Sequence, residues 1–196
     1  MNALLAFSRL VDAINTHVGK LVTWLVLVAV LISAANAIVR KTLDYSSNAW
    51  LEVQWYLFSA VFLLCAAYTL LRNEHIRIDV VAGRFSKRTQ TWIDIFGTVF
   101  FLLPMVALVL YEAWPWFVRT FVSKEVSASA GGLILWPAKI LLPIGFALLG
   151  LQGISELIKR IAFLRGLAPD PTEKFGEKSP EEILAEQIRR ERGEAA

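Results

Sequence analysis

The sequence is poor in the side chains that build disulfides, metal centres and haem sites. It has one cysteine, Cys65, and two histidines, His17 and His75. A single cysteine excludes an intramolecular disulfide and a cysteine-based metal cage. Both histidines lie outside the long apolar runs, which argues against a haem held by two histidines within a helix bundle. No His, Cys and carboxylate cluster has metal-site spacing, so we predict no cofactor and no metal.

Signatures of nucleotide and nucleic-acid chemistry are also missing. No G-x-x-x-x-G-K-[ST] run occurs, so the sequence offers no P-loop for ATP hydrolysis. The formal net charge is +3, but the basic residues flank apolar runs. Lys and Arg in such places set the topology of membrane helices and meet anionic lipid. We therefore expect contact with membrane lipid and not with nucleic acid, and we predict no catalytic residues and no enzyme.

The sequence is instead rich in apolar residues, and these lie in long uncharged runs. Hydrophobic residues make up 56% of the 196 residues, whereas soluble domains carry roughly 45–50%. About 20 apolar residues suffice for an α-helix to cross roughly 30 Å of hydrocarbon. Because backbone groups in lipid must be bonded within the segment, the runs predict helices. We predict an all-α membrane protein with four spans, at about residues 21–39, 50–71, 93–118 and 133–158.

The charges of the connecting segments predict the orientation. The second loop and the segment after the fourth span are rich in Lys and Arg. The first and third loops have few basic residues: Arg40, Lys41, Arg119 and Lys124. Because cytoplasmic loops carry the excess of Lys and Arg, both termini and the second loop are expected in the cytoplasm. The first run could also be a signal peptide cleaved near residues 35–37, but it is longer than a typical signal core.

The segments outside the four runs predict short helices. Residues 1–19 can form an amphipathic helix lying in the membrane interface, or a disordered start. Asp79 is expected to cap a short amphipathic helix, and Ser86 to cap the helix that enters the third span. Ser179 and Pro180 predict a further helix in the tail. The predicted domains are an interfacial segment (1–19), a membrane domain (20–160) and a cytoplasmic tail (161–196).

The most specific pattern lies between the second span and the loop that follows it. Glu52 stands at the outer end of the span, and the run Phe62-Leu63-Leu64-Cys65-Ala66-Ala67 follows it. The pattern closes with His75-Ile76-Arg77-Ile78-Asp79-Val80. It resembles the small membrane subunit of tripartite ATP-independent periplasmic (TRAP) transporters. The likeness extends over the four-span layout, roughly residues 8–165, and does not include the tail after Pro169.

The resemblance implies a role in solute uptake. Such systems combine a periplasmic solute-binding protein, a large membrane subunit that moves the solute with a sodium gradient, and a small subunit that acts as a scaffold. Their typical solutes are organic acids. The implied partners are thus a large multi-span subunit and a solute-binding protein, in a bacterial or archaeal inner membrane. Two alternatives stay open: a self-sufficient four-helix transporter, and a membrane anchor subunit of an enzyme complex.

Several residues are candidates for structural or partner contacts. Small residues let helices approach closely in lipid, so Ser33 on the first span and Gly150 on the fourth are expected to face protein. Glu52 belongs to the family-like pattern. Residues of the second loop are expected to brace that loop or to contact the large subunit: Arg72, His75, Arg77 and Asp79.

Charged residues near the outer side give two further predictions. Glu112 and Lys139 lie at similar depth on neighbouring spans, and pairing would lower the cost of each charge in lipid. Alternatively, Lys139 extends to the headgroups without a partner. Lys124 and Glu125 of the third loop are expected to form a minor part of the docking surface for the solute-binding protein, where charges mainly affect the association rate.

Overall fold

The computed structural model describes residues 2–45, 47–73 and 85–169. Within these ranges the chain is helical apart from its turns, and its only β-type pairing is the isolated bridge between Val126 and Ile134. The predicted helix capped by Asp79, the predicted tail helix, and the brace residues His75 and Arg77 lie outside the described residues.

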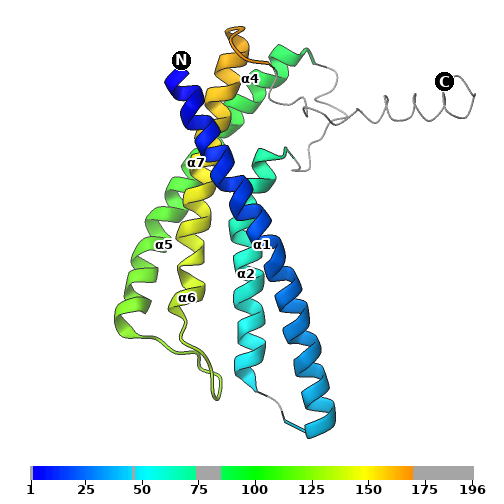
Figure 1. The fold of residues 1–196 in the computed structure, drawn as a ribbon. Helices are drawn as coiled ribbons and strands as arrows, with labels where there is room; N and C mark the ends of the chain where they lie inside the picture. The colour runs from blue at the N-terminus through cyan, green and yellow to red at the C-terminus, as the bar shows by residue number, and fades with distance from the viewer. Residues whose placement is uncertain (1, 46, 74–84, 170–196) are drawn as a thin grey trace, which may run out of the picture.

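Four helical spans form the fold (Figure 1). The first two are single helices, α1 (Asn2–Leu43) and α2 (Asn48–Leu71). The third consists of α4 (Lys87–Gly97), the π-helix η1 (Thr98–Leu102) and α5 (Leu103–Ser123). The fourth consists of α6 (Trp136–Lys139) and α7 (Leu141–Leu164). All four spans are long and apolar enough to cross a membrane, which confirms the predicted all-α, four-span fold for the described part of the chain.

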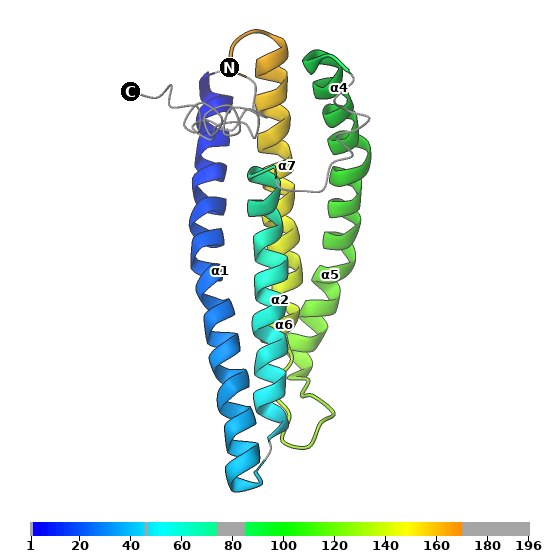
Figure 2. The ribbon, with the colours of Figure 1, turned by 90° about the vertical axis from the view of Figure 1, so that its right-hand side faces the viewer.

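α7 is the central helix of the bundle, because it packs against α1, α2 and α5. The beginning of α1 and the end of α7 lie at one end of the bundle, called here the terminal end (Figure 1). The opposite end, called the loop end, holds the turn after α1 and the loop of residues 124–135. At the terminal end, α1, α4 and α7 extend beyond the last residue of α2 (Figures 1 and 2).

α1 is a single continuous helix and does not break at the predicted boundary between residues 19 and 20. Its 42 residues span roughly 63 Å, about twice the thickness of the hydrocarbon. Buried residues recur every three or four positions along its first half: Ser8, Val11, Asn15, Gly19 and Val22. One face of the first 19 residues therefore packs against protein as part of this helix, and their predicted place in the membrane interface stays a prediction. The helix that continues beside them is α7.

The start of the third span follows the sequence prediction. The side-chain oxygen of Ser86 accepts a hydrogen bond from the backbone N–H of Thr89 at 3.3 Å, so the predicted N-cap at Ser86 is confirmed. Within the span, η1 has the wider turns of a π-helix, which shift the register of α5 by about one residue, or about 100°. Asp94 and Glu112 are eighteen residues apart, five turns of a regular α-helix, and would otherwise share a face. The shift lets Asp94 face the bundle while Glu112 is exposed.

Close approach of helices depends on two glycines. A Cβ atom at Gly145 of α7 would lie 2.7 Å from the carbonyl oxygen of Leu63 in α2. A Cβ atom at Gly19 of α1 would lie 2.5 Å from the ring of Tyr68, also in α2. The backbones of α1 and α7 thus come close to α2 only because these positions have no side chain. Both contacts set the spacing of α1, α2 and α7, and α1 and α7 hold most of the polar residues described next.

Candidate functional site

The first candidate site is a group of polar side chains at the terminal end, between α1, α4 and α7. We call it the terminal cluster. α7 contributes the largest share from one of its faces, α1 contributes three residues and α4 one. The members are Ser8, Asp12, Asn15, Asp94, Gln152, Ser155, Glu156, Lys159 and Arg160.

Gln152 is the fully buried centre of the terminal cluster. Its Oε1 accepts a hydrogen bond from Nδ2 of Asn15 at 2.7 Å, and its Nε2 donates to Asp12 at 2.9 Å and to Glu156 at 3.0 Å. One turn further along α7, the hydroxyl oxygens of Ser155 and Ser8 lie 2.6 Å apart. These bonds can form in only one register, so they fix how α1 lies along α7.

Charged groups surround this centre. Lys159 pairs with Asp12 at 3.1 Å and with Glu156, while Arg160 pairs with Glu156 at 3.0 Å and with Asp94 at 3.3 Å. Glu156 and Arg160 are each only 5% exposed. A buried ion pair adds little net stability, but removal of one partner leaves an uncompensated charge and costs about 3–5 kcal/mol. The terminal cluster therefore holds α1, α4 and α7 together in one specific arrangement.

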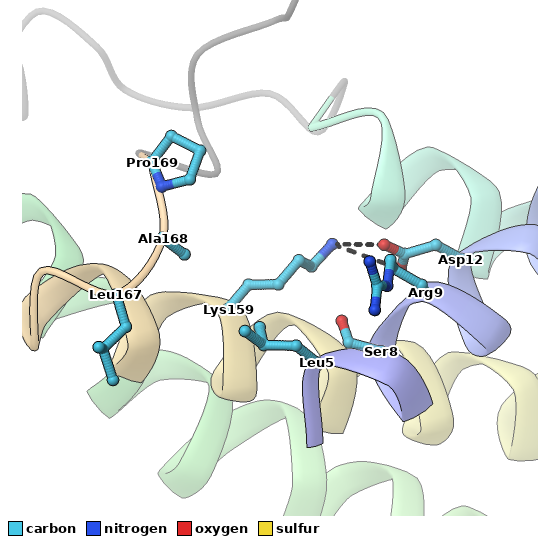
Figure 3. Close-up of a pocket in the computed structure, with 8 residues that line it drawn as sticks. All are labelled: Leu5, Ser8, Arg9, Asp12, Lys159, Leu167, Ala168 and Pro169. Carbon is cyan, nitrogen blue, oxygen red and sulfur yellow. Dashed lines mark hydrogen bonds and ion pairs between the residues drawn. The ribbon is translucent and has the colours of Figure 1, made fainter. Parts of the chain in front are cut away.

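A pocket of about 690 Å³ lies beside the terminal cluster (Figure 3). Figure 3 shows Lys159 reaching across to Asp12, with Arg9 next to this pair. The lining residues are Leu5, Ser8, Arg9, Asp12, Lys159, Leu167, Ala168 and Pro169. The pocket borders the terminal cluster through Ser8, Asp12 and Lys159. The charged groups of Asp12 and Lys159 are already bonded to each other. Among the described residues, no group of His, Cys, Asp and Glu side chains could hold a metal ion.

The second candidate site is at the loop end and fastens the loop of residues 124–135 to α2. Glu52, which is buried, accepts a hydrogen bond from the backbone N–H of Leu133 at 2.7 Å and another from the hydroxyl of Ser127. On either side of Glu52, Asn48 donates to the carbonyl of Ala130 at 3.1 Å, and Tyr56 donates to that of Ile134 at 3.0 Å. The start of α2 therefore holds the loop in one conformation.

Lys139, the last residue of α6, connects the same loop to α5. Its Nζ lies 2.6 Å from a carboxylate oxygen of Glu125, donates to the hydroxyl of Thr120 at 2.7 Å, and lies 4.5 Å from the ring centre of Trp116. The hydrogen bonds from Lys139 and then Thr120 hold the pKa of Glu125 below its ordinary value, against the opposing effect of burial. Together with Glu52 and Ser127, these residues form the loop cluster.

Sequence comparison identifies the family of the chain that carries these two clusters. A family model for the DctQ component of tripartite ATP-independent periplasmic transporters matches residues 29–163, a range that reaches from the middle of α1 to the end of α7. The chain is a member of the DctQ family. The predicted resemblance is thereby confirmed, and the protein is the small membrane subunit of a TRAP transporter. No match to the chain was found among curated proteins or among solved structures.

The predicted ion pair between Glu112 and Lys139 is wrong for this DctQ subunit. Lys139 ends the short helix α6, which begins at Trp136 and not at residue 133, so its side chain turns toward the loop and Glu125. Lys139 does not extend alone to the headgroups either, because its side chain is 13% exposed and paired. Glu112 is exposed on α5 and has no hydrogen bond or ion pair with any described residue.

The other sequence candidates have varied surroundings in the DctQ subunit. Nε of Arg72 donates to the hydroxyl of Tyr68 at 2.9 Å. Gly150 is buried against Val106, and Ser33 is half-buried. Lys124 is exposed where α5 ends, with a φ of 50°. The predicted contacts of these residues with partner subunits stay predictions.

Sequence reasoning missed the terminal cluster, although a signal for it exists. Gln152, Ser155, Glu156 and Lys159 recur at intervals of three or four along an otherwise apolar span. Such spacing places polar side chains on one face of a helix, and in a membrane span that face must meet protein. Asp12 gave no comparable signal, because it lies in a segment that reads equally well as a surface helix. The α1 residues of the cluster precede the matched range, whereas those of α4 and α7 lie within it.

Proposed function

We propose that this DctQ subunit is a scaffold in an uptake system for organic acids that is driven by an ion gradient. In this proposal a large membrane subunit moves the solute, and a periplasmic solute-binding protein delivers it. The small subunit holds the fixed part of the large subunit in the membrane. The family match supports the assignment to a tripartite system, whereas the solute class, the ion coupling and the roles of the partners are our inference.

The observation that favours a scaffold is the state of the buried charges. A transporter that works alone needs an ionisable group inside a span that is free to bind an ion or a solute. The buried charged residues of the spans are instead bonded within the chain: Glu52, Glu156 and Arg160. Charged groups that are already bonded within the chain suit a rigid support better than a moving carrier.

We further propose that the terminal end is cytoplasmic and the loop end periplasmic. The distribution of Lys and Arg between the loops supports this orientation. Single cysteines introduced at Ser129 and at Arg165, in a Cys65→Ala background, would test it in intact cells. We expect an impermeant maleimide to label the Ser129→Cys variant and not the Arg165→Cys variant, and the reverse pattern would contradict the proposal.

Reconstitution tests the scaffold proposal. Proteoliposomes that contain the small and large subunits should accumulate an organic acid only with a sodium gradient and with the loaded binding protein outside. Vesicles with the small subunit alone should show no uptake. Uptake by the small subunit alone would support a self-sufficient transporter. Co-purification with a soluble enzyme, and not with a multi-span protein, would support an anchor subunit.

A further inference from the structure

Five carboxylates lie in the four span helices of the described chain: Asp12, Glu52, Asp94, Glu112 and Glu156. Four of them are buried or half-buried and bonded within the chain. Glu112 is the exception, because it is exposed and has no hydrogen bond or ion pair with any described residue. The fold satisfies every other carboxylate of its spans, so the isolation of Glu112 requires an explanation.

Glu112 lies on the lipid side of an aromatic belt. Trp114 and Trp116 are exposed near the loop end of α5, and exposed tryptophans mark the boundary between lipid and water. At 1.5 Å per residue, Glu112 lies roughly 3–6 Å further into the membrane than these rings. On the other side, residues 95–111 carry no charge. A carboxylate at this depth faces acyl chains unless another protein covers it.

The surroundings of Glu112 form a continuous exposed stripe that begins in η1 at Phe101 and runs along α5. Its members recur at alternating intervals of four and three residues, so they follow one side of the helix. They are Phe101, Met105, Leu108, Glu112, Pro115, Arg119 and Val122, and we call them the α5 stripe. The stripe is apolar except for Glu112 and for Arg119 at its loop end. It faces away from the side of α5 that packs against α7 through Val106.

We propose that the α5 stripe is the surface on which the large membrane subunit packs, and that a helix of that subunit presents a lysine or arginine level with Glu112. This inference rests on the proposed function. Charge complementarity selects the occupant. Lipid acyl chains offer the carboxylate no partner, and two copies related by a two-fold axis along the membrane normal would place Glu112 against Glu112. A cation from a different membrane subunit satisfies the carboxylate and excludes lipid from it.

Cross-linking in the assembled transporter tests the surface. A photoreactive amino acid replaces Leu108 of the stripe in one variant and Phe62 of α2 in a matched control, and these side chains are 65% and 78% exposed. Each variant is co-expressed with the large subunit in membranes. We expect a product of small plus large subunit from the Leu108 variant and not from the Phe62 variant. A product with a second small subunit, with lipid alone, or from Phe62 only would overturn the proposal.

Charge substitution tests the role of Glu112. Loss of one partner of a desolvated charge pair weakens an interface by roughly 30-fold or more. We therefore expect Glu112→Lys to reduce recovery of the large subunit on the tagged small subunit by about that factor, and Glu112→Gln to reduce it less. Thermal unfolding of the isolated small subunit checks that each variant folds. Normal recovery with Glu112→Lys would refute the pairing. Failure of the unmodified subunit to recover any large subunit would instead refute the proposed function.

Discussion

At the scale of single residues, the partners of each charge depend on depth and helix face. Glu156 accepts hydrogen bonds or ion pairs from Gln152, Lys159 and Arg160, all on its own helix, and is almost fully buried. Glu112 is the same residue type, also within a span, and is exposed without a partner among the described residues. The comparison of these two glutamates separates a charge bonded inside the subunit from the charge that we propose pairs with another subunit.

Removal of the Glu156 carboxylate should destabilise the isolated subunit. Glu156→Leu leaves Arg160 and Lys159 with fewer acceptors in a buried place, so we expect a loss of about 3–5 kcal/mol in the free energy of unfolding. Denaturant unfolding in detergent micelles, followed by circular dichroism, measures it. Glu112→Gln is the matched control and should change stability by less than about 0.5 kcal/mol. Equal losses in both variants would mean that burial of Glu156 is unimportant.

The pair between Glu125 and Lys139 predicts a pH dependence of the loop cluster. Because the folded-state pKa of Glu125 is lowered, mainly by the hydrogen bond from Lys139, the pair stabilises the loop above the ordinary glutamate pKa of about 4.3. That contribution is lost as the pH falls through the lowered pKa. We expect the protection of the amides of residues 124–135, measured relative to their intrinsic exchange rates, to fall below about pH 4. Lys139→Met should move the onset toward higher pH, and an unchanged onset would contradict the assignment.

At the scale of elements, the packing of α7 against α2 depends on the missing side chain of Gly145. We expect Gly145→Ala to destabilise the subunit by about 1–3 kcal/mol, because the new methyl group would overlap the backbone of Leu63. Gly97→Ala in α4 is the matched control. No atom lies within 4 Å of its added Cβ, so the change should be neutral or stabilising by up to about 1 kcal/mol. Thermal unfolding in detergent compares the two, and a larger loss from Gly97→Ala would contradict the packing argument.

The helix that carries the α5 stripe illustrates how one irregular element redirects a whole face. In a regular α-helix, Glu112 would point to the same side as Asp94, and hence toward the bundle. The wider turns of Thr98–Leu102 rotate α5, so its buried side becomes Val106, Ala113 and Thr120. The same rotation turns Glu112 outward. The π-helix thus decides which residues of the third span remain available to a partner.

At the scale of the whole molecule, the two clusters stand at opposite ends of one long bundle. The terminal cluster joins α1, α4 and α7, which extend beyond the end of α2 (Figures 1 and 2). The loop cluster joins α2, α5 and α6 to the loop of residues 124–135. A bundle whose helices are bonded to each other at both ends fits the rigid scaffold that we propose. It also presents an ordered loop surface at the loop end.

This loop surface gives a prediction for the assembled transporter. Lys124 is exposed there, whereas Glu125 is occupied by Lys139. We expect Lys124→Glu to slow uptake by about two- to tenfold at low salt and to have less effect at high salt, because a peripheral charge mainly alters the association rate of the binding protein. Uptake in proteoliposomes at two ionic strengths measures it. Rates equal to those of the unmodified transporter at both would remove Lys124 from the docking surface.

The sequence by itself determined the class of the protein, because run length and the lack of charge are local properties. Uncharged runs of about 20 residues require membrane helices whatever their neighbours are. The N-cap at Ser86 was equally local, since its hydroxyl bonds an amide only three residues away. The pattern from Glu52 through the second loop also identified the family, although it gave no role for Glu52 in holding a loop eighty residues later in the chain.

Only the tertiary structure decided which charges meet. Asp12 and Lys159 are 147 residues apart in sequence and lie in contact because α1 and α7 run side by side well past the end of α2. Lys139 pairs with Glu125 and not with Glu112 because the start of α6 and the register shift in η1 set directions that no local pattern encodes. The pairing of charges depends on helix rotation and relative height, and both arise from packing among all four spans.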